Sequence, residues 1–460
     1  MKSKYFRFLP FLPLFLKFIN SNSTTFKIIK AFFSALLLSN FIYFSFFENL
    51  LFEFISPFLS IYGLILLLRN KSKIGYFYTG FFVGILWFWW IALSSIYFDL
   101  AYLIPLEIIL IGLIYGLLFL VCFFLKYDFL RLCGIFLLSF VHPFGFDWLN
   151  WGVLSVYGIF DASYQGIIAM FLIAYFYYEK YISRYYKIAI ILILILIGAQ
   201  YNQKQSQTLN LDYKLIQTNI SQDQKFIQEN LHTHSKDIFY QINQAIKEGK
   251  EVIVFPETAF AFALNKAPSY LQALKDLSKQ IIIITGAIST TPNHLYNSTY
   301  VFDNGNIQVF NKHYLVPFGE EIPIFKNFFK KYLLNIDEFS KGKELNQYTL
   351  NNQLITNAIC FEATKEKLYK HSKIIIAISN NAWFNFSSEY KLQNFLMRFY
   401  ANNYNVSIYH AVNGKENAVI KSKEILILKI KEKLLKQNEA QKLHYYNALN
   451  SSRASNFSQG

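Results

Sequence analysis

Hydrophobic residues are concentrated in the first 200 positions of the chain, and most of the charged residues come after them. A membrane-spanning helix needs about 20 mainly apolar residues, and fewer where anchoring residues flank it. The first part of the chain contains seven apolar runs near this length, of which the last two are short. They predict membrane-spanning helices at residues 28–47, 50–68, 74–97, 101–125, 129–146, 166–178 and 188–199.

The short connections between these runs alternate in charge, and this alternation predicts how the chain is oriented. The connections at residues 69–73, 126–131 and 179–187 are basic, whereas the intervening ones carry acidic residues and few bases. The acidic residues are Glu48, Glu53, Asp99, Asp147 and Asp161. Because basic connections stay on the cytoplasmic side, the last span should leave the membrane near Gln200 on the outer side, which is the periplasm in a bacterial cell.

From about residue 209 the pattern changes to alternating strands and helices. Asp303, Asn304 and Gly305 separate two short apolar segments and predict a β-hairpin. Strands are predicted at residues 213–219, 251–257, 281–288, 299–302, 307–310, 354–361 and 374–379, and helices at residues 222–249, 268–279 and 389–404. Two hydrophobic sheets covered by helices account for this order. The predicted fold class is therefore a membrane α-helical bundle followed by an α/β domain.

Four regions follow from these patterns. Residues 1–24 are basic and apolar and predict an interfacial or disordered leader, residues 25–200 hold the spans, and residues 205–420 form the α/β domain. Residues 421–460 form a charged, polar tail with no apolar run long enough for a further span. A helix lying on the membrane surface is an alternative for residues 425–435.

Composition narrows the class of protein. The 460-residue chain is 54% hydrophobic and only 16% charged, which is too apolar for an ordinary soluble enzyme of this length. Its formal net charge of +15 comes largely from basic loops, and no motif that reads DNA or RNA is present, so nucleic acid is not an expected partner. His232 and His234 fall in a polar helix, where solvation is the simplest interpretation. We expect no metal and no cofactor.

Three polar residues stand at the ends of predicted strands or in the loop after one, and together they could perform acyl transfer. Glu257 ends the segment VIVFPE, Lys312 follows IQVF, and Cys360 ends LITNAIC. Strand ends of a layered α/β domain converge on one edge, where sites usually form. A carboxylate can take the proton of a cysteine thiol, and a lysine ammonium lowers the thiol pKa and stabilises an oxyanion. The backbone N–H of Phe361 could supply a second oxyanion donor.

Each of these residues also has a structural interpretation. A lone cysteine at a strand end is usually a small core residue, and a lone glutamate there is often a cap or a salt-bridge partner. A lone loop lysine is nearly always solvated. Cys122 and Cys133 lie inside apolar runs and are interpreted as small membrane residues. Spacing alone therefore makes the Glu–Lys–Cys group a weak signal.

Four segments of the chain strengthen the Glu–Lys–Cys signal, because they resemble known proteins and occur in the same order. They are FPETAF (255–260), NKHYLVPFGEEIP (311–323), AICFE (358–362) and ISNNAWF (378–384). They resemble the signature blocks of the nitrilase superfamily, and so imply an α-β-β-α sandwich. On a domain that follows several spans, LVPFGE and SN-x-AWF are similar to the apolipoprotein N-acyltransferase family, as is the segment IQTNISQDQKF (216–226). The resemblance covers roughly residues 28–420.

The resemblance implies roles for named residues. By similarity, Glu257 is the general base, Lys312 the oxyanion-stabilising lysine and Cys360 the acylated nucleophile, and Glu320 supports them. Glu362, Asn380 and Asn381 match other active-site positions, and Phe361 and Trp383 are further candidates for supporting or substrate-binding roles. The sequence departs from the family at Asn381, where aspartate is common, at Phe361, where tyrosine is common, and in lacking the usual final span.

The resemblance also implies the reaction and its partners. The expected acyl donor is a phospholipid, usually phosphatidylethanolamine, and the expected acceptor is the amine of a diacylglyceryl-cysteine apolipoprotein. A membrane-tethered amidase or nitrilase acting on a small C–N substrate is the main alternative. A transporter would need ionisable residues in its spans, which hold little besides Glu107. A catalytically silent scaffold would tolerate replacement of Cys360.

Overall fold

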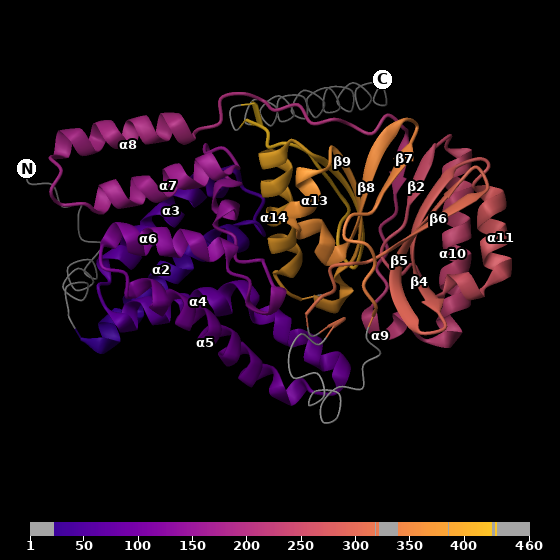
Figure 1. Cartoon of the computed structure of the whole chain (residues 1–460), viewed down its shortest axis with the longest axis horizontal. Helices are drawn as coiled ribbons and strands as arrows, with labels where there is room; N and C mark the ends of the chain where they lie inside the picture. Colours follow the sequence, from indigo (N-terminus) through magenta and orange to yellow (C-terminus); the bar gives the residue numbers. More distant parts are fainter. Residues whose placement is uncertain (1–22, 318, 322–338, 385, 426–427, 430–460) are drawn as a thin grey trace, which may run out of the picture.

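The computed structural model describes residues 23–317, 319–321, 339–384, 386–425 and 428–429, and consists of two parts that lie side by side (Figure 1). The helical part covers residues 24–198, and the α/β part covers residues 213–420. Most of the predicted leader and most of the predicted tail lie outside the described residues. Within the described residues, the order of helices and then an α/β domain confirms the predicted fold class.

The helical part contains four helices that are long and apolar enough to cross a membrane, among the residues that the structure describes. They are Thr24–Phe44, Leu50–Arg69, Lys73–Tyr97 and Ala101–Phe123. The helices of this part are α2 (Thr24–Phe44), α3 (Leu50–Arg69), α4 (Lys73–Phe88), α5 (Ile104–Phe123), α6 (Asp128–Leu137), α7 (Tyr164–Tyr178) and α8 (Arg184–Gly198), with 3-10 helices η1 (Trp89–Phe98), η2 (Ala101–Leu103), η3 (Leu138–Phe140), η4 (Pro143–Gly145) and η5 (Trp151–Ser155).

The prediction of one continuous span over residues 129–146 is wrong. Helix α6 ends at Leu137, one 3-10 turn continues to Phe140, and the backbone is extended at Val141. Pro143 explains the break, because a proline removes a backbone donor and pushes the residue before it out of the helical region. The other six apolar runs each form a helix close to the predicted bounds.

The α/β part contains two mixed sheets: β1, β2 and β4 are parallel in the first, and β8, β9 and β10 are parallel in the second. The first has the order β1-β2-β4-β5-β6, with β3 beside β4, and the second has the order β11-β10-β9-β8-β7. The strands are β1 (Tyr213–Leu215), β2 (Val252–Val254), β3 (Phe260–Ala263), β4 (Ile282–Thr291), β5 (His294–Asp303), β6 (Asn306–Asn311), β7 (Gln347–Leu350), β8 (Gln353–Ile359), β9 (Ile374–Asn380), β10 (Ser407–Asn413) and β11 (Ala418–Ile420).

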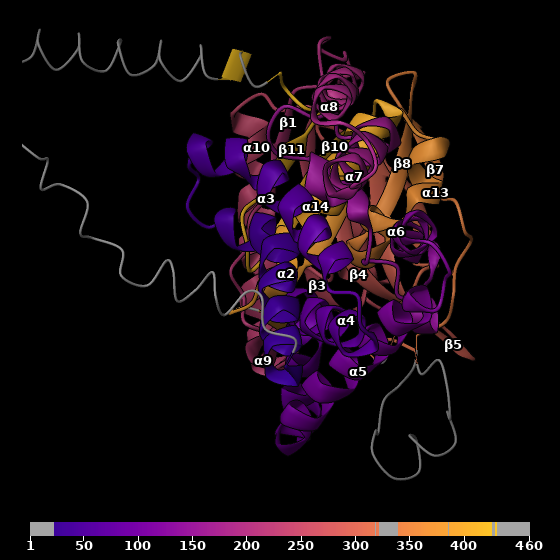
Figure 2. The same cartoon turned by 90° about the vertical axis from the view of Figure 1, so that its left-hand side faces the viewer.

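The two sheets lie face to face between layers of helices, so the part is an α-β-β-α sandwich (Figures 1 and 2). Val254 and Ile284 of the first sheet share a buried core with Ile359 and Ile376 of the second. The outer face of the first sheet is covered by α10 (Gln228–Lys247) and α11 (Pro268–Leu277). The outer face of the second packs on α13 (Glu366–Lys370) and α14 (Glu389–Tyr404).

Several predicted elements differ in length from the observed ones. The predicted helix at residues 222–249 is two helices, α9 (Gln222–Lys225) and α10, which are separated at Phe226 and Ile227. The predicted strand at residues 251–257 ends at Val254, so Glu257 lies in the turn beyond it. The hairpin is confirmed, with Asn304 and Gly305 both at positive φ.

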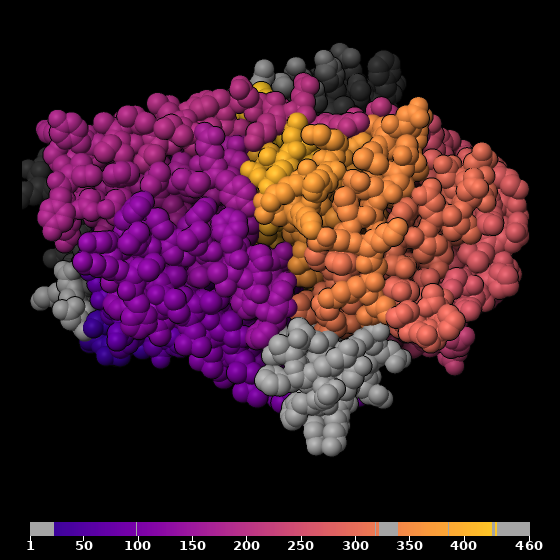
Figure 3. Space-filling model, viewed as in Figure 1, coloured from indigo at the N-terminus to yellow at the C-terminus, as the bar shows by residue number. Residues whose placement is uncertain are grey.

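The helical part packs directly on the α13/α14 layer of the sandwich (Figure 3). Phe41 of α2 lies edge-on against Phe395 of α14, with ring centroids 4.9 Å apart. Polar contacts flank this apolar contact: Trp148 Nε1 donates to Thr364 Oγ1 over 2.8 Å, and Lys365 forms an ion pair with Asp147 over 2.8 Å. One continuous hydrophobic core therefore runs through both parts.

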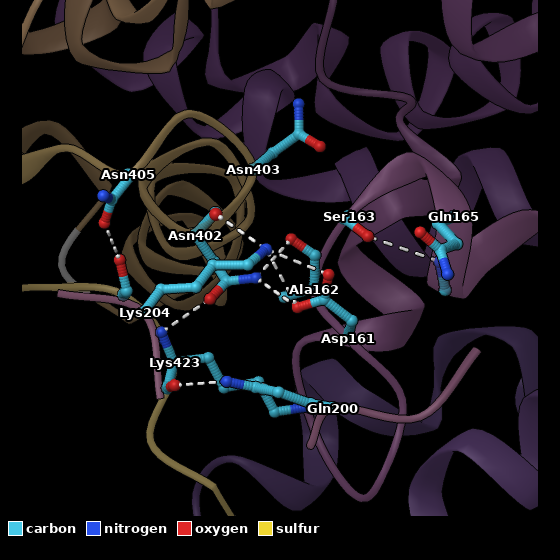
Figure 4. A network of polar contacts seen from close by, with 12 residues as sticks. Asp161, Ala162, Ser163, Gln165, Gln200, Lys204, Asn402, Asn403, Asn405 and Lys423 are labelled. Carbon is cyan, nitrogen blue, oxygen red and sulfur yellow. Dashed lines mark hydrogen bonds and ion pairs between the residues drawn. The ribbon is translucent and has the colours of Figure 1, made fainter. Parts of the chain in front are cut away.

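A second set of polar contacts joins the two parts where the chain leaves each of them (Figure 4). Lys423 Nζ donates to the carbonyls of Ser155, Tyr157 and Phe160 at 3.0, 3.3 and 2.5 Å. Asp161 accepts from Lys204 at 2.9 Å and from the Asn402 amide at 2.7 Å. The ammonium of Lys423 thus ties the end of the α/β part to backbone carbonyls of the helical part.

Candidate active site

The structure brings Glu257, Lys312 and Cys360 together at one edge of the two sheets. Glu257 follows β2, Lys312 follows β6, and Cys360 follows β8. The side chains of Glu257 and Lys312 are 7% and 1% exposed, and Nζ of Lys312 lies 3.4 Å from Oε1 of Glu257. Cys360 is near enough for both charges to shift the pKa of its thiol.

Two donors besides Lys312 hold the carboxylate of Glu257. The side-chain amide of Asn297, on β5, donates to Oε1 over 2.7 Å, and the backbone N–H of Asn380, at the end of β9, donates to Oε2 over 2.8 Å. Gly286 allows the backbone of β4 to lie close to the backbone of Glu257, because a Cβ at this position would be only 2.6 Å from the Cα of Glu257. Both carboxylate oxygens are therefore fixed before any substrate arrives.

Glu320 is the second carboxylate in contact with Lys312. Nζ of Lys312 lies 2.9 Å from one carboxylate oxygen of Glu320 and 2.8 Å from the other. The second oxygen also accepts from the backbone N–H of Val316 over 2.9 Å. Two carboxylates thus balance one buried ammonium and determine where it points.

Charge interactions set the protonation states of the three residues. Burial opposes ionisation of Glu257, yet Lys312 and the hydrogen bond from Asn297 keep the pKa of its carboxyl below the usual value. Burial also opposes ionisation of Lys312, but Glu320 and Glu257 raise its pKa above the usual value. Burial and then Glu257 raise the pKa of the Cys360 thiol. The resting site is therefore a carboxylate, an ammonium and a neutral thiol, as general-base activation requires.

The backbone at Cys360 is unusual and presents the thiol at a sharp turn. Its φ is +52°, a region that non-glycine residues seldom adopt, and it opens the 3-10 helix η7 (Cys360–Thr364) directly after β8. The next residue, Phe361, stacks on Phe146 of the helical part, with centroids 6.1 Å apart and planes 5° apart. Strained backbone of this kind clusters at active sites.

Glu362 connects the loops that carry the lysine and the cysteine. Its carboxylate accepts from the backbone N–H groups of His313 and Tyr314 at 2.7 and 3.2 Å, and from that of Ile359 at 2.9 Å. Two of these N–H groups directly follow Lys312 in the chain, and the third directly precedes Cys360. Glu362 therefore positions the two loops relative to each other.

The remaining predicted residues are spread around the site. The side chain of Asn380 is held by Gln222 and Asn413, whereas the Asn381 amide donates to Gln393 of α14 over 3.0 Å. The segment 381–384 forms the 3-10 helix η8 (Asn381–Phe384). Trp383 lies edge-on against Tyr97 of the helical part at 5.0 Å.

Two residues near the triad escaped the sequence analysis. Asn297 lies in the middle of β5, where nothing distinguishes it from other strand positions. Lys225 is 2% exposed, and its Nζ donates to the main-chain carbonyl of Glu257 over 2.8 Å. Burial lowers the pKa of Lys225 to about 8, against the opposing charges of Glu257 and Cys360. Its place in the segment IQTNISQDQKF is the signal that could have identified it.

Among the described residues, no group of three or more His, Cys, Asp and Glu side chains is arranged to hold a metal ion. His232 and His234 lie on α10, and His232 Nδ1 is 3.4 Å from the hydroxyl of Tyr270.

Comparisons with known proteins agree in pointing to one family. Residues 25–199 match the family model described as the apolipoprotein N-acyltransferase integral membrane domain. The apolipoprotein N-acyltransferase of Campylobacter jejuni is 64% identical over 91% of this chain and 95% of its own length. That of Wolinella succinogenes is 36% identical over 85% of this chain and 95% of its own length.

Similarity to solved structures is much weaker. A CN-hydrolase superfamily protein from Xanthomonas campestris has a TM-score of 0.36 and 11% identity, covering 46% of this chain and 83% of that one. Similarity at this level supports no statement about the reaction.

Proposed function

Because this chain belongs to the apolipoprotein N-acyltransferase family, we propose that Glu257, Lys312 and Cys360 carry out its reaction through a cysteine thioester. The protein is a membrane-bound acyltransferase of lipoprotein maturation. Residues 25–200 would hold it in the bilayer, and residues 205–420 would form the catalytic domain. A small-substrate amidase would use the same three residues, but the relatives at 64% and 36% identity are acyltransferases.

One observation supports this assignment most: the cysteine loop is packed against the connection at residues 146–148 of the helical part. Phe361 stacks on Phe146 and lies 6.1 Å from the ring of Trp148, both in the helical part. An acyl chain loses about 0.8 kcal/mol of favourable burial for each CH₂ exposed to water. A nucleophile at this boundary can reach a lipid ester while the chain stays in an apolar surrounding.

In the first half of the reaction, the carboxylate of Glu257 takes the proton of the Cys360 thiol. The sulfur then attacks an ester carbonyl of a phospholipid, for which phosphatidylethanolamine is the expected donor. The ammonium of Lys312 and the backbone N–H of Phe361 would stabilise the oxyanion. The C–O bond breaks, and the departing lysophospholipid oxygen takes the proton back from Glu257, which leaves the acyl chain on Cys360.

In the second half, the free amine of a diacylglyceryl-cysteine apolipoprotein attacks the thioester. The amine passes one proton to Glu257, the C–S bond breaks, and the proton returns to the sulfur. An N-acylated lipoprotein and the free thiol result. Both substrates are lipids, and the alternation of basic and acidic connections supports a catalytic domain on the periplasmic side of the inner membrane.

The test is transfer between two defined lipids. Purified protein is incubated with phosphatidylethanolamine that carries a labelled acyl chain and with a synthetic diacylated lipopeptide that has a free amino terminus. We expect the label on the amine of the lipopeptide and an equal amount of lysophospholipid. Release of labelled fatty acid without any labelled lipopeptide would contradict the proposal and favour a hydrolase.

A further inference from the structure

Lys225 is a second buried lysine at the catalytic base, and the mechanism above does not use it. It is the last residue of α9, and its side chain is buried. Its Nζ donates to the main-chain carbonyl of Glu257 over 2.8 Å, although the two residues are 32 positions apart in the chain. Within the described residues, this carbonyl is the one hydrogen-bond partner of that Nζ.

The stability of the fold does not explain this contact. An ammonium group loses its hydration when it is buried, and a single carbonyl offsets little of that cost. The cost is visible in the acid strength of the group, because burial lowers the pKa of Lys225 to about 8 against the opposing charges of Glu257 and Cys360. A buried lysine that is retained at such a cost beside a candidate active site indicates a functional role.

The carbonyl that Lys225 holds belongs to a strained turn. Thr258, the next residue, has a φ of +48°, which is rare for a β-branched side chain. The turn is also pressed against β4: the N–H of Gly286 donates to the carbonyl of Pro256 over 3.2 Å, and a Cβ at Gly286 would lie 2.4 Å from the backbone nitrogen of Thr258. Strained backbone persists only where its surroundings hold it, and Lys225 supplies such a contact from a distant segment.

The short helix α9 also reaches the carboxylate end of the base. The side-chain amide of Asn380 donates to Oε1 of Gln222, the first residue of α9, over 2.8 Å. The backbone N–H of the same Asn380 donates to the carboxylate of Glu257 over 2.8 Å. Helix α9 therefore contacts both the carbonyl of Glu257 and the residue that donates to its carboxylate.

We propose that Lys225 is a positioning residue for the catalytic base: its Nζ fixes the carbonyl of Glu257, and with it the turn that presents the carboxylate to the Cys360 thiol. The inference rests on the acyl transfer proposed above, in which Glu257 takes the proton of that thiol. In this role Lys225 neither gives nor takes a proton. It acts on the rate through the place and the charge state of Glu257.

The charge of Lys225 should be measurable through the acid strength of Glu257. The titratable groups that interact with Glu257 are Lys312, Lys225, Cys360, Glu389 and His410, and Lys312 is itself paired with Glu320. Burial raises the pKa of the Cys360 thiol and brings that of Glu389 to about 8 and that of His410 to about 4, so these three are mainly neutral between about pH 5 and 7.

The positive charge that faces Glu257 in this range therefore comes from the two lysines. Burial opposes ionisation of Glu257, and Lys312, the amide of Asn297 and then Lys225 keep the pKa of its carboxyl low. Removal of the charge of Lys225 should raise that pKa, so that the base is protonated over a wider range of acidic pH.

The experiment measures acylation of Cys360 by the full-length protein between pH 4 and pH 9, with the concentration of labelled phosphatidylethanolamine varied. Lys225→Met removes the donor and the charge, Lys225→Gln keeps a donor without the charge, and Lys225→Arg keeps both. Lys423→Met is the matched control, because it removes another ammonium that donates to main-chain carbonyls, at the contact between the two parts. The melting temperature of each variant is measured in detergent.

We expect Lys225→Met to lower the maximal acylation rate about 10- to 100-fold, the effect of losing a hydrogen bond from a charged donor. The phospholipid concentration that gives the half-maximal rate should stay within about threefold, because Lys225 acts on the base rather than on the lipid. The acid limb of the rate should move to higher pH. Lys225→Gln should show the same movement with a smaller loss of rate, which tests the charge even if Lys225→Met does not fold.

Lys225→Arg should recover the wild-type acid limb and most of the rate. Lys423→Met should keep the wild-type limb and a rate within about threefold, although it melts at a lower temperature. Wild-type acylation by Lys225→Met would overturn the proposal. So would a loss of rate with the acid limb unmoved, or a loss that Lys423→Met reproduces, because Lys225 would then only support the fold. Failure of the wild-type protein to acylate Cys360 would instead refute the proposed function, so the two failures are distinguishable.

Discussion

The side-chain amide of Asn297 donates to a carboxylate oxygen of Glu257 over 2.7 Å, so an uncharged residue in the middle of a strand orients the base. The same nitrogen lies 3.0 Å from Oε1 of Glu320, which makes Asn297 a bridge between the two carboxylates around Lys312. Without this donor, two buried negative charges would face a single ammonium group. The activity should therefore depend on Asn297 as well as on the triad.

Replacement of Asn297 by Asp should slow acylation of Cys360 about 10- to 100-fold, because a donor to a charged group is lost and a third acidic side chain enters the site. The rate of label incorporation from phosphatidylethanolamine measures the effect. Asn306→Asp, at an exposed position of β6, is the control and should retain the wild-type rate. An unimpaired Asn297→Asp protein would show that this hydrogen bond does not orient the base.

Removal of the charge of Lys312 should shift the pH dependence of acylation. In the wild-type protein the pKa of Glu257 is below its usual value, so the base stays ionised at all pH values above about 4.5. In Lys312→Met burial would dominate, the pKa of Glu257 would rise, and the acid limb of the rate would move to higher pH. The residual acylation rate measured between pH 4 and 8 gives the position of that limb.

The lowered pKa of Glu257 also determines how the stability of the protein changes with pH. A carboxyl group with a lowered pKa contributes stability above its usual pKa and loses it as the pH falls through the folded-state value. Lys312→Met should therefore lose less stability than the wild type when the pH is lowered from 6 to 4. Lys343→Met, which alters an exposed lysine, should keep both wild-type profiles.

Lys423 should contribute to stability through contact between the two parts rather than through chemistry. Its Nζ donates to three backbone carbonyls, and Lys423→Met would leave them without this donor. We expect a loss of about 2–4 kcal/mol in the free energy of unfolding. It would be measured as a lower melting temperature in detergent. Lys421→Met, at an exposed neighbouring position, should melt like the wild type.

The sequence predicted the parts of the fold whose cause is local. The hairpin at Asp303–Gly305 follows from turn chemistry, and α14 follows from a helical pattern between two clear boundaries. The break after α6 depends on Pro143, which lies at the far end of an otherwise uniform apolar run. Strands β3, β7, β10 and β11 were missed because they are short or are specified by pairing with distant strands, which a local pattern does not contain.

The sequence predicted the charged residues of the candidate site but not the residues that hold them in place. Strand ends and resemblance identified Glu257, Lys312 and Cys360. Asn297 and the backbone N–H of Asn380 could not be found in this way, because their roles depend on which strands become neighbours.

The proposed reaction requires the sulfur of Cys360 to carry the acyl chain between the two half-reactions. Wild-type protein is incubated with phosphatidylethanolamine that has a labelled acyl chain, in the absence of acceptor, and its peptides are mapped before and after neutral hydroxylamine. We expect label on the peptide that contains Cys360, its release by hydroxylamine, and none on Cys360→Ser under the same treatment. Label on another residue, or transfer to the lipopeptide by Cys360→Ala at the wild-type rate, would contradict the account.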